Sequence, residues 1–346
     1  VDEASMIDVF LMDRLVRALA PTARLVLLGD ADQLPSVAAG AVFRDALSAA
    51  GPAQVKLTHS YRMRKEDAGG ATVLRVAQKM NAGEVGLFGP ELAVHRPELA
   101  TLTGQGVEHA ELPRERRRGF LDRWYRDRAR GDGHLRPLLV ERVWTADVDG
   151  RLREPELAQV FGWFEQARVL CLTQAFELGA RRVNARLHDR AAREAGAPPE
   201  RPFLAGEPVM VLHNDYDRGL FNGDQGVVLR VEDGEGTRPM AVFPDPEPGV
   251  WRAFALGALA GRLSLAYAMT VHKAQGSEFD AVAVLLPDRD LPLLTRELLY
   301  TAVTRARRSV WLLGDRALLN QGVRRAAVRH AGLAARLRPP APEDSQ

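Results

Sequence analysis

Apolar residues follow a helical spacing in several parts of the chain, and short apolar runs separate these parts. Ser5 and Asp8 form a capping-box pattern, after which apolar residues recur at helical intervals as far as Leu19. The apolar run 24–28 ends in Gly29-Asp30, which is typical of a buried parallel strand. Helices are further predicted at 40–50, 72–82, 154–167, 179–194 and 295–307, and strands at 54–57, 169–173, 264–267, 281–286 and 310–313.

Strands that alternate with helices in this way predict an α/β fold with a doubly wound parallel sheet. In such a sheet, ligands bind at the carboxyl ends of the strands. Asp2-Glu3 and Asp30 both fall at predicted strand ends, so the pattern itself places these acids at a candidate ligand site.

The pattern changes between 203 and 262, where short predicted strands and tight turns replace helices. Asn222-Gly223-Asp224 and Asp233-Gly234 are turn signals, and the string Asn222 to Gly226 is interpreted chiefly as a hairpin turn. This region is predicted to be a small β-barrel inserted in the second α/β domain. The pattern is weak from 83 to 150, where the charge run 114–118 favours a solvated face over a DNA contact.

Composition narrows the class of protein only slightly. The 346 residues carry a net charge of +2 and 46% hydrophobic residues, as in ordinary globular proteins, and no run of 18 apolar residues predicts a membrane span. The single cysteine, Cys171, excludes an internal disulfide and lies in an apolar run, which predicts a buried core residue. These features indicate a cytoplasmic protein.

Adjacent carboxylates at the start of the chain are suited to phosphoryl transfer. Asp2 and Glu3 can divide two tasks, because hydrolysis of a phosphoanhydride needs a metal ion beside the phosphates and a group that orients water. We therefore expect Asp2 to hold Mg²⁺ and Glu3 to position the attacking water.

Four further strings follow in a fixed order. They are Gly29-Asp30-Ala31-Asp32-Gln33, Ser60-Tyr61-Arg62, the segment from Thr270 to Glu278, and the segment from Tyr300 to Arg307. Together with Asp2-Glu3 they resemble the motor of superfamily 1 DNA helicases, and specifically the RecD family of subunits of RecBCD helicase–nucleases.

The resemblance implies two RecA-like domains, of which the first is incomplete, and an SH3-like β-barrel insert. The expected boundaries are 1–58 for the first domain, 59–202 with 263–338 for the second, 203–262 for the insert and 339–346 for a disordered tail. It also implies ATP as the nucleotide and 5′ to 3′ movement on single-stranded DNA, beside RecB-like and RecC-like subunits in double-strand-break repair and recombination.

The resemblance assigns roles to residues of these strings. Gln33 would sense the γ-phosphate, Arg62 would grip it, and Arg305 would stabilise the transition state, with Thr301 one helical turn earlier. The residues expected nearer to the nucleotide or its metal are Asp30, Tyr61, Gly276 and Glu278. Plain core packing stays open for Tyr61. The residues expected to face DNA are Thr270, His272 and Lys273.

The lysines set a limit on this interpretation. Lys56, Lys65, Lys79 and Lys273 are the only four, and none stands in a Gly-Lys-Ser/Thr phosphate loop. We therefore expect the chain to be the C-terminal part of a longer protein and to be inactive by itself. Two alternatives are a stand-alone RecD-like helicase and, if the natural chain has no such loop, a non-catalytic DNA-binding or assembly subunit.

Overall fold

The computed structural model describes residues 1–36, 38–49, 53–57, 67–89, 92–198 and 200–328, together with Leu333 and Arg336. The α-helices are α1 (Val9–Ala18), α2 (Val42–Ala49), α3 (Ala68–Asn81), α4 (Arg117–Trp124), α5 (Leu135–Val140), α6 (Leu157–Gln166), α7 (Ala180–Ala195), α8 (Arg296–Val303) and α9 (Arg316–Arg324). The strands are β1 (Val94–Arg96), β2 (Gly106–Ala110), β3 (Val143–Thr145), β4 (Arg151–Leu152), β5 (Ala167–Cys171), β6 (Pro208–Val211), β7 (Gln225–Glu232), β8 (Thr237–Pro244), β9 (Trp251–Ala255), β10 (Leu263–Leu265), β11 (Ala268–Thr270), β12 (Phe279–Leu285) and β13 (Ala306–Leu313).

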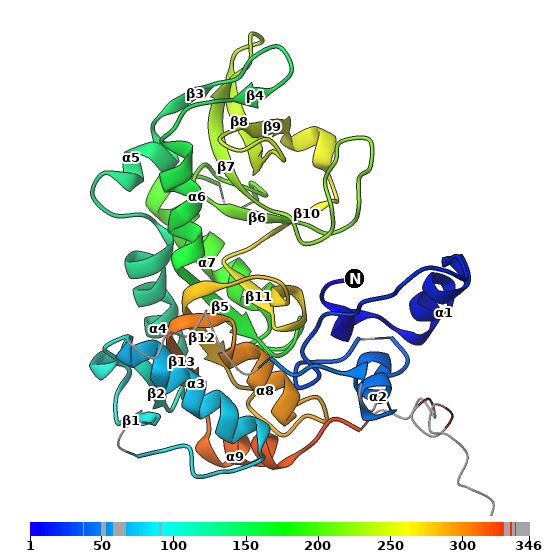
Figure 1. Ribbon diagram of the computed structural model, residues 1–346. Helices are drawn as coiled ribbons and strands as arrows, with labels where there is room; N and C mark the ends of the chain where they lie inside the picture. Colours follow the sequence, from blue (N-terminus) through cyan, green and yellow to red (C-terminus); the bar gives the residue numbers. More distant parts are fainter. Residues whose placement is uncertain are drawn as a thin grey trace, which may run out of the picture.

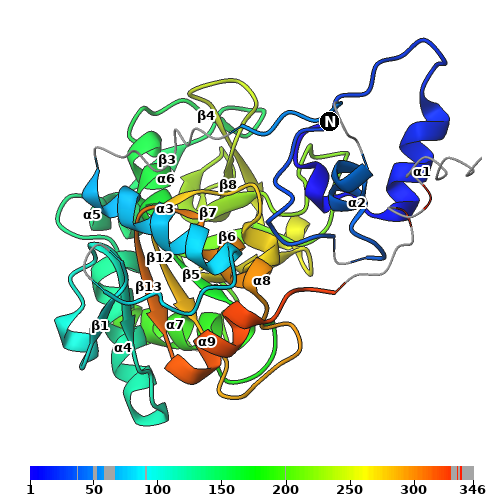
Figure 2. The same ribbon diagram turned by 60° about the horizontal axis from the view of Figure 1, so that its bottom comes forward.

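We distinguish two lobes: the first lobe comprises the described residues up to 57, and the larger, second lobe comprises those from 67 onward. A parallel sheet forms the centre of the larger lobe (Figure 1). Its strand order is β1-β2-β13-β12-β5-β11, and every neighbouring pair is parallel. Along β12, Val282 and Val284 pack with α3, α8 and α9, whereas Ala283 and Leu285 pack with α4 and α7. Both faces are therefore covered by helices (Figure 2), which confirms the predicted α/β class.

The predicted helix at 72–82 is confirmed, although α3 begins earlier because Asp67 caps it: its carboxylate accepts from the Gly69 amide. The weakly patterned region 83–150 supplies β1 and β2, and the wholly buried β2 pairs with β13. This contribution to the central sheet was not predicted.

A second, mainly antiparallel sheet lies at the other end of the molecule (Figure 1). Its order is β10-β6-β7-β8-β9-β4, and β3 pairs in parallel with β7. Helix α6 packs on it, since Leu157 and Val160 share a core with Leu229 and Val231. The predicted insert at 203–262 corresponds to most of this sheet. However, β3 and β4 come from 143–152, and the domain boundaries stay a prediction.

The first lobe differs most from its prediction. The capping box at Ser5 is wrong, because Asp8 itself caps α1 and accepts from the Leu11 amide. The predicted buried strand at 24–28 is wrong as well: Val26 is 63% and Leu28 is 54% exposed. The physical reason is that this segment has a backbone partner on one side only among the described residues. The predicted strand at 54–57 is also absent there.

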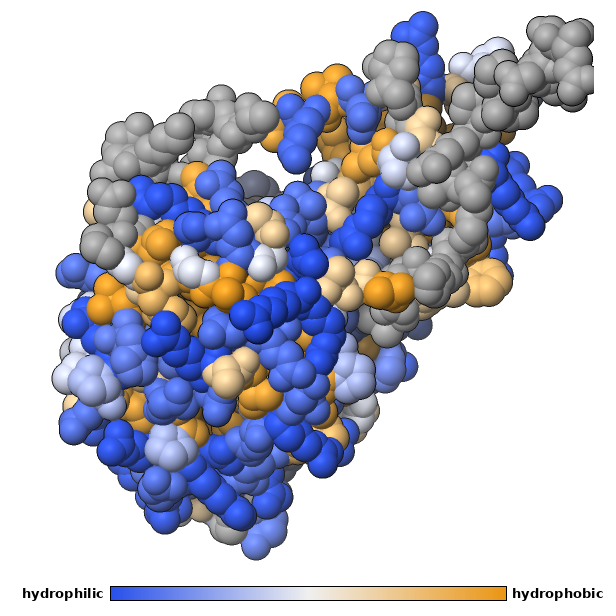
Figure 3. All heavy atoms as spheres, turned by 90° about the horizontal axis from the view of Figure 1, so that it is seen from below, coloured by the Kyte–Doolittle hydropathy of each residue, from blue (hydrophilic) through white to orange (hydrophobic). Residues whose placement is uncertain are grey.

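On the face seen in Figure 3, hydrophobic side chains are interspersed with hydrophilic ones. Among the helices that the structure describes, none combines the length and apolarity needed to cross a bilayer. Cys171 is fully buried, and burial raises the pKa of its thiol, as expected for a core residue.

Candidate nucleotide and nucleic-acid site

Residues 1–4 and 26–28 of the first lobe run side by side. The Ala4 amide donates to the Leu28 carbonyl at 2.8 Å. A Cβ on Gly29 would lie 3.1 Å from the Ala4 nitrogen, so this approach of two backbones requires a glycine. The acidic pair at the start of the chain and the loop that follows Gly29 therefore adjoin in space.

Asp2 and Glu3 differ in environment. Asp2 is exposed, and its Oδ1 accepts from the Glu3 amide at 2.8 Å. Glu3 has a left-handed backbone with φ of 50°, a conformation that is costly for a residue with a side chain and is often found at functional sites. No group of three or more metal-ligating side chains lies in the described residues. An exposed carboxylate nevertheless fits Mg²⁺, which commonly takes one or two carboxylates beside substrate phosphates and water.

Asp30 organises the loop after Gly29. Its Oδ2 accepts from the side-chain nitrogen Nε2 of Gln33 at 3.2 Å and from the Tyr300 hydroxyl at 3.0 Å. Burial, reinforced by the Asp30 charge, raises the pKa of Tyr300, so its hydroxyl stays a donor. Gln33 is only 8% exposed, and its Oε1 accepts no hydrogen bond from the described residues. A buried amide oxygen in this state is available to a ligand.

Side-chain to backbone hydrogen bonds join the two lobes at this loop. The Leu34 amide donates to Thr301 Oγ1 at 2.9 Å, and Gln275 Nε2 donates to the Leu34 carbonyl at 3.0 Å. Arg44 of the first lobe also faces the buried Glu297 at 3.6 Å. The loop 30–35 therefore docks on α8 and on the segment that follows β11. We call this contact between the two lobes the joint.

Arg305 lies behind this joint, not on a helix. The predicted helix 295–307 is too long, because α8 ends at Val303 and the Arg305 carbonyl accepts from the Phe279 amide at 2.9 Å, where β12 and β13 begin to pair. Arg305 is 1% exposed. Its guanidinium donates to the carbonyls of Thr301 and Ser277 at 3.2 and 3.3 Å.

The segment from Thr270 to Glu278 follows β11 at the carboxyl end of the central sheet. Its regular structure beyond β11 is a 3₁₀ turn at His272–Ala274, so no α-helix begins within this segment. Thr270 Oγ1 accepts from the Lys273 amide at 3.4 Å, and burial lowers the pKa of Lys273. Gly276 has φ of 77°, which only glycine adopts without strain.

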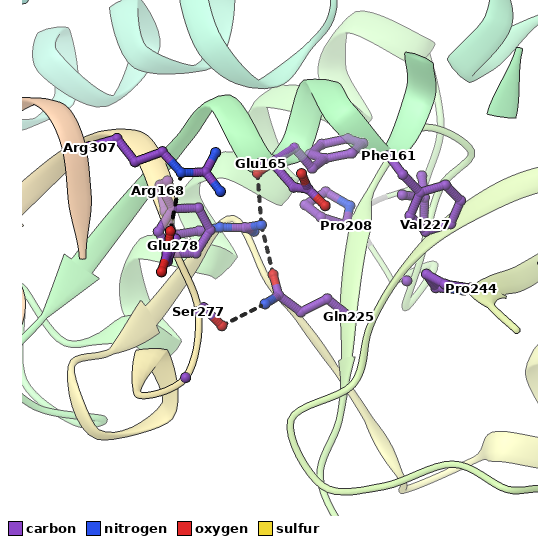
Figure 4. Close-up of a pocket in the computed structure, with 14 residues that line it drawn as sticks. Phe161, Glu165, Arg168, Pro208, Gln225, Val227, Pro244, Ser277, Glu278 and Arg307 are labelled. Atoms are coloured by element: carbon purple, nitrogen blue, oxygen red, sulfur yellow. Dashed lines mark hydrogen bonds and ion pairs between the residues drawn. The ribbon is translucent and has the colours of Figure 1, made fainter. Parts of the chain in front are cut away.

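A cavity of about 470 Å³ lies between this segment and the second sheet (Figure 4). Ser277 Oγ accepts from Gln225 at 3.3 Å, and Gln225 Oε1 accepts from the buried Arg168 at 2.8 Å. Glu278 accepts from Arg307 at 3.2 Å. The turn predicted at 222–226 is present at Asn222 and Gly223, but Gln225 already belongs to β7, because its backbone pairs with Met210 of β6.

The structure thus brings together residues that are distant in sequence. Asp30 contacts Gln33 and Tyr300 of α8, Arg305 donates to Thr301 of the same helix, and residues 1–4 lie beside 26–28, which lead into the loop of Asp30. His272 shares a second cavity, of about 670 Å³, with Leu34 and Pro35 of the first lobe. Ser60, Tyr61 and Arg62 lie outside the described residues.

Sequence reasoning missed three contributors to the joint. Tyr300, Thr301 and Gln275 stand inside the strings that were singled out, but their contacts with the first lobe were not predicted. Their polar groups beside apolar neighbours were the available signal, because buried polar side chains usually find a partner.

Two family models match the chain. A UvrD-like helicase C-terminal domain matches residues 265–313, and an AAA domain matches residues 1–94. The RecBCD enzyme subunit RecD of Mycobacterium tuberculosis (strain ATCC 25618 / H37Rv) is 36% identical over 97% of this chain and 52% of its own length. The RecD subunit of Mycolicibacterium smegmatis is 35% identical, over 98% and 54%. The ATP-dependent RecD2 DNA helicase of Deinococcus radiodurans is 31% identical, over 89% and 35%.

These matches confirm the predicted resemblance to RecD subunits, and the chain spans about half the length of the curated relatives it matches. Solved structures that match the chain include a Pif1 helicase from Candida albicans, with a TM-score of 0.42 and 16% identity, covering 96% of this chain and 74% of that one. Pif1 from Bacteroides with ADP-AlF3 and ssDNA has a TM-score of 0.41 and 17% identity, covering 92% and 71%.

Proposed function

We propose that this chain forms part of the motor of an ATP-dependent DNA helicase of the RecBCD type, which moves 5′ to 3′ along single-stranded DNA in break repair and recombination. Similarity to RecD subunits over nearly the whole chain supports this proposal. The observation that carries it is the joint between the lobes, where the loop 30–35 meets α8 and Gln275. A motor of this kind needs such a joint to link a nucleotide cleft to movement.

The chain's residues would divide the chemistry between the two lobes. Glu3 would orient the attacking water, and Gln33, with its unused buried oxygen, would respond to the γ-phosphate. Arg62 and Arg305 would face the phosphates from the second lobe. Asp30, Tyr61, Gly276 and Glu278 would complete the nucleotide site.

Asp2 would hold Mg²⁺ through its exposed carboxylate. The metal ion, when bound, supplies positive charge beside the phosphates. Thr270, His272 and Lys273 would contact the DNA backbone from the carboxyl end of the sheet.

The assembly is also a proposal. RecB-like and RecC-like subunits are the expected partners, because the RecD subunits of Mycobacterium tuberculosis and Mycolicibacterium smegmatis match a larger share of this chain at higher identity than the Deinococcus radiodurans RecD2 helicase does. This difference favours the complex over a stand-alone helicase. The cytoplasmic location stays a prediction from composition.

The test replaces Arg305 in the full natural protein. Arg305→Lys keeps a cation in the buried site but cannot reproduce its forked hydrogen bonds, and Arg305→Ala removes the charge. We expect DNA-stimulated ATP hydrolysis to fall by roughly 10³-fold or more in both, with unwinding lost and DNA binding kept. Arg308→Ala is the matched control, because the Arg308 side chain is 71% exposed and its ion-pair partner within the described part of the chain is Asp67. Unwinding at the parent rate in both Arg305 variants would remove the assignment.

A further inference from the structure

Phe176 lies in the loop that follows β5 and has an unusual backbone conformation. Its φ is 72°, a left-handed conformation that is costly for a bulky aromatic residue. Its ring is not packed in the core, since the residue is 59% exposed. The fold therefore bears a strained backbone in order to present an aromatic ring to its surroundings.

A cation covers one face of this ring. The Arg289 guanidinium carbon lies 5.1 Å from the ring centroid of Phe176. No carboxylate among the described residues forms an ion pair with Arg289. The nearby carboxylates are already matched, because Asp288 pairs with Arg117, and Glu177 pairs with Arg186 and lies 3.6 Å from Arg182.

The pair borders a cavity of about 290 Å³ at the ends of β5 and β12. Leu172, Leu178 and Leu285 give it an apolar wall, and the charged residues of its lining are Arg289, Glu177 and Asp288, of which both carboxylates are paired with other arginines. An apolar slot beside an aromatic ring, with one arginine at its edge that has no carboxylate partner among the described residues, suits a flat ring that is attached to a phosphate.

This cavity adjoins the segment proposed to contact DNA. Strand β11 lies beside β5 in the central sheet, and the Val271 amide donates to the Cys171 carbonyl at 3.1 Å. The loop that carries Arg289 continues to Asp290, which lines the cavity beside His272. The two cavities therefore flank one loop along the same edge of the sheet.

We infer that Phe176 and Arg289 form a stacking site for an unpaired base of single-stranded nucleic acid, with Arg289 also placed near its phosphate. This inference rests on the proposed function and adds a base contact to its backbone contacts. Stacking of this kind does not depend on base identity, because every base has a π-face. A motor that follows any sequence requires such tolerance.

The test uses Phe176→Gly in the full natural protein. Glycine accepts φ of 72° without strain, so the variant keeps its fold and loses only the ring. We expect its affinity for a deoxythymidine oligonucleotide to fall about 5- to 150-fold, the range for one lost stack. Affinity for an abasic deoxyribose-phosphate strand of the same length should not change. Phe176→Trp should restore binding to the thymidine strand.

Two controls separate the possible failures. Phe10→Ala removes an aromatic side chain that is 68% exposed on α1, and it should bind both strands as the parent does. If the parent binds neither strand, both the stacking site and the proposed function are overturned. If the parent binds both strands and Phe176→Gly binds them equally well, the stacking site alone is overturned.

Discussion

At the scale of single residues, Gly29 sets the distance between the two acidic segments of the first lobe. A Cβ there would lie 3.1 Å from the backbone nitrogens of Ala4 and Ser5, which cannot move independently. We expect Gly29→Ala to lower the free energy of unfolding of the full natural protein by about 1–3 kcal/mol, the usual cost of overpacking. Urea unfolding measures this change.

Gly162→Ala is the matched control for Gly29→Ala. Gly162 lies inside α6, and a Cβ on it would meet no atom within 4 Å. The same substitution should therefore stabilise the protein by roughly 0.5–1 kcal/mol through helix propensity. Equal effects of the two changes would contradict the close approach at Gly29.

The sequence was sufficient to select residues of the joint but not their contacts. Asp30 and Gln33 were expected near the nucleotide, and in the structure Asp30 forms partly buried hydrogen bonds with Gln33 and with Tyr300. Tyr300 was not expected to bind Asp30, because that contact spans 270 positions and depends on how two lobes dock. Local patterns carry no information of that kind.

At the scale of elements, β2 shows why the region 83–150 gave a weak pattern. This wholly buried strand carries Glu108 and His109, and these polar side chains interrupt the apolar pattern that would predict a buried strand. Glu108 is held by Arg96 and the Thr103 and Gly104 amides, and His109 bonds His95 and the Gly314 carbonyl. Helix α3, in contrast, places its apolar residues at regular spacing and was predicted.

His109 should make stability depend on pH. Burial, and then the nearby His95, lowers the pKa of His109 from 6.5 to about 4. The unfolded chain takes up a proton near pH 6.5 and the folded chain does not, so stability is complete above 6.5 and declines as pH falls toward 4. We expect the free energy of unfolding to fall by about 2 kcal/mol between pH 7 and pH 5 because of this residue.

Urea unfolding at pH 7 and 5 tests the His109 prediction. His109→Gln should show a smaller loss over this range than the parent, since the variant has no group that titrates there. His213→Gln, a change at an exposed histidine, serves as the control and should match the parent. An identical pH dependence in the parent and in His109→Gln would contradict the assignment.

At the scale of the whole molecule, the described residues of the first lobe form only a small core around Ala4, Ile7 and Phe43, whereas the larger lobe has two extensive ones. The central sheet is covered on both faces, whereas α1 buries none of its residues and the segment 24–28 leaves Val26 and Leu28 exposed. The position of the first lobe relative to the larger lobe therefore depends largely on the contacts that its loop makes at Leu34. This dependence explains why its predicted core strands were wrong. In the larger lobe, the strands predicted at 169–173, 281–286 and 310–313 largely coincide with β5, β12 and β13, whereas the prediction at 264–267 overlaps β10 of the second sheet and misses β11 of the central one.

The joint at Leu34 can be loosened without removing a cavity-filling side chain. Thr301→Val keeps the shape of the side chain but leaves the buried Leu34 amide without the acceptor it has at 2.9 Å. An unsatisfied amide costs about 1–3 kcal/mol, so hydrogen exchange at Leu34 should accelerate by roughly 5- to 150-fold in the full natural protein. Thr145→Val, at an exposed residue of β3, should leave the rate of hydrogen exchange at Leu34 unchanged. Equal exchange in the parent and in Thr301→Val would show that the lobes are held together elsewhere.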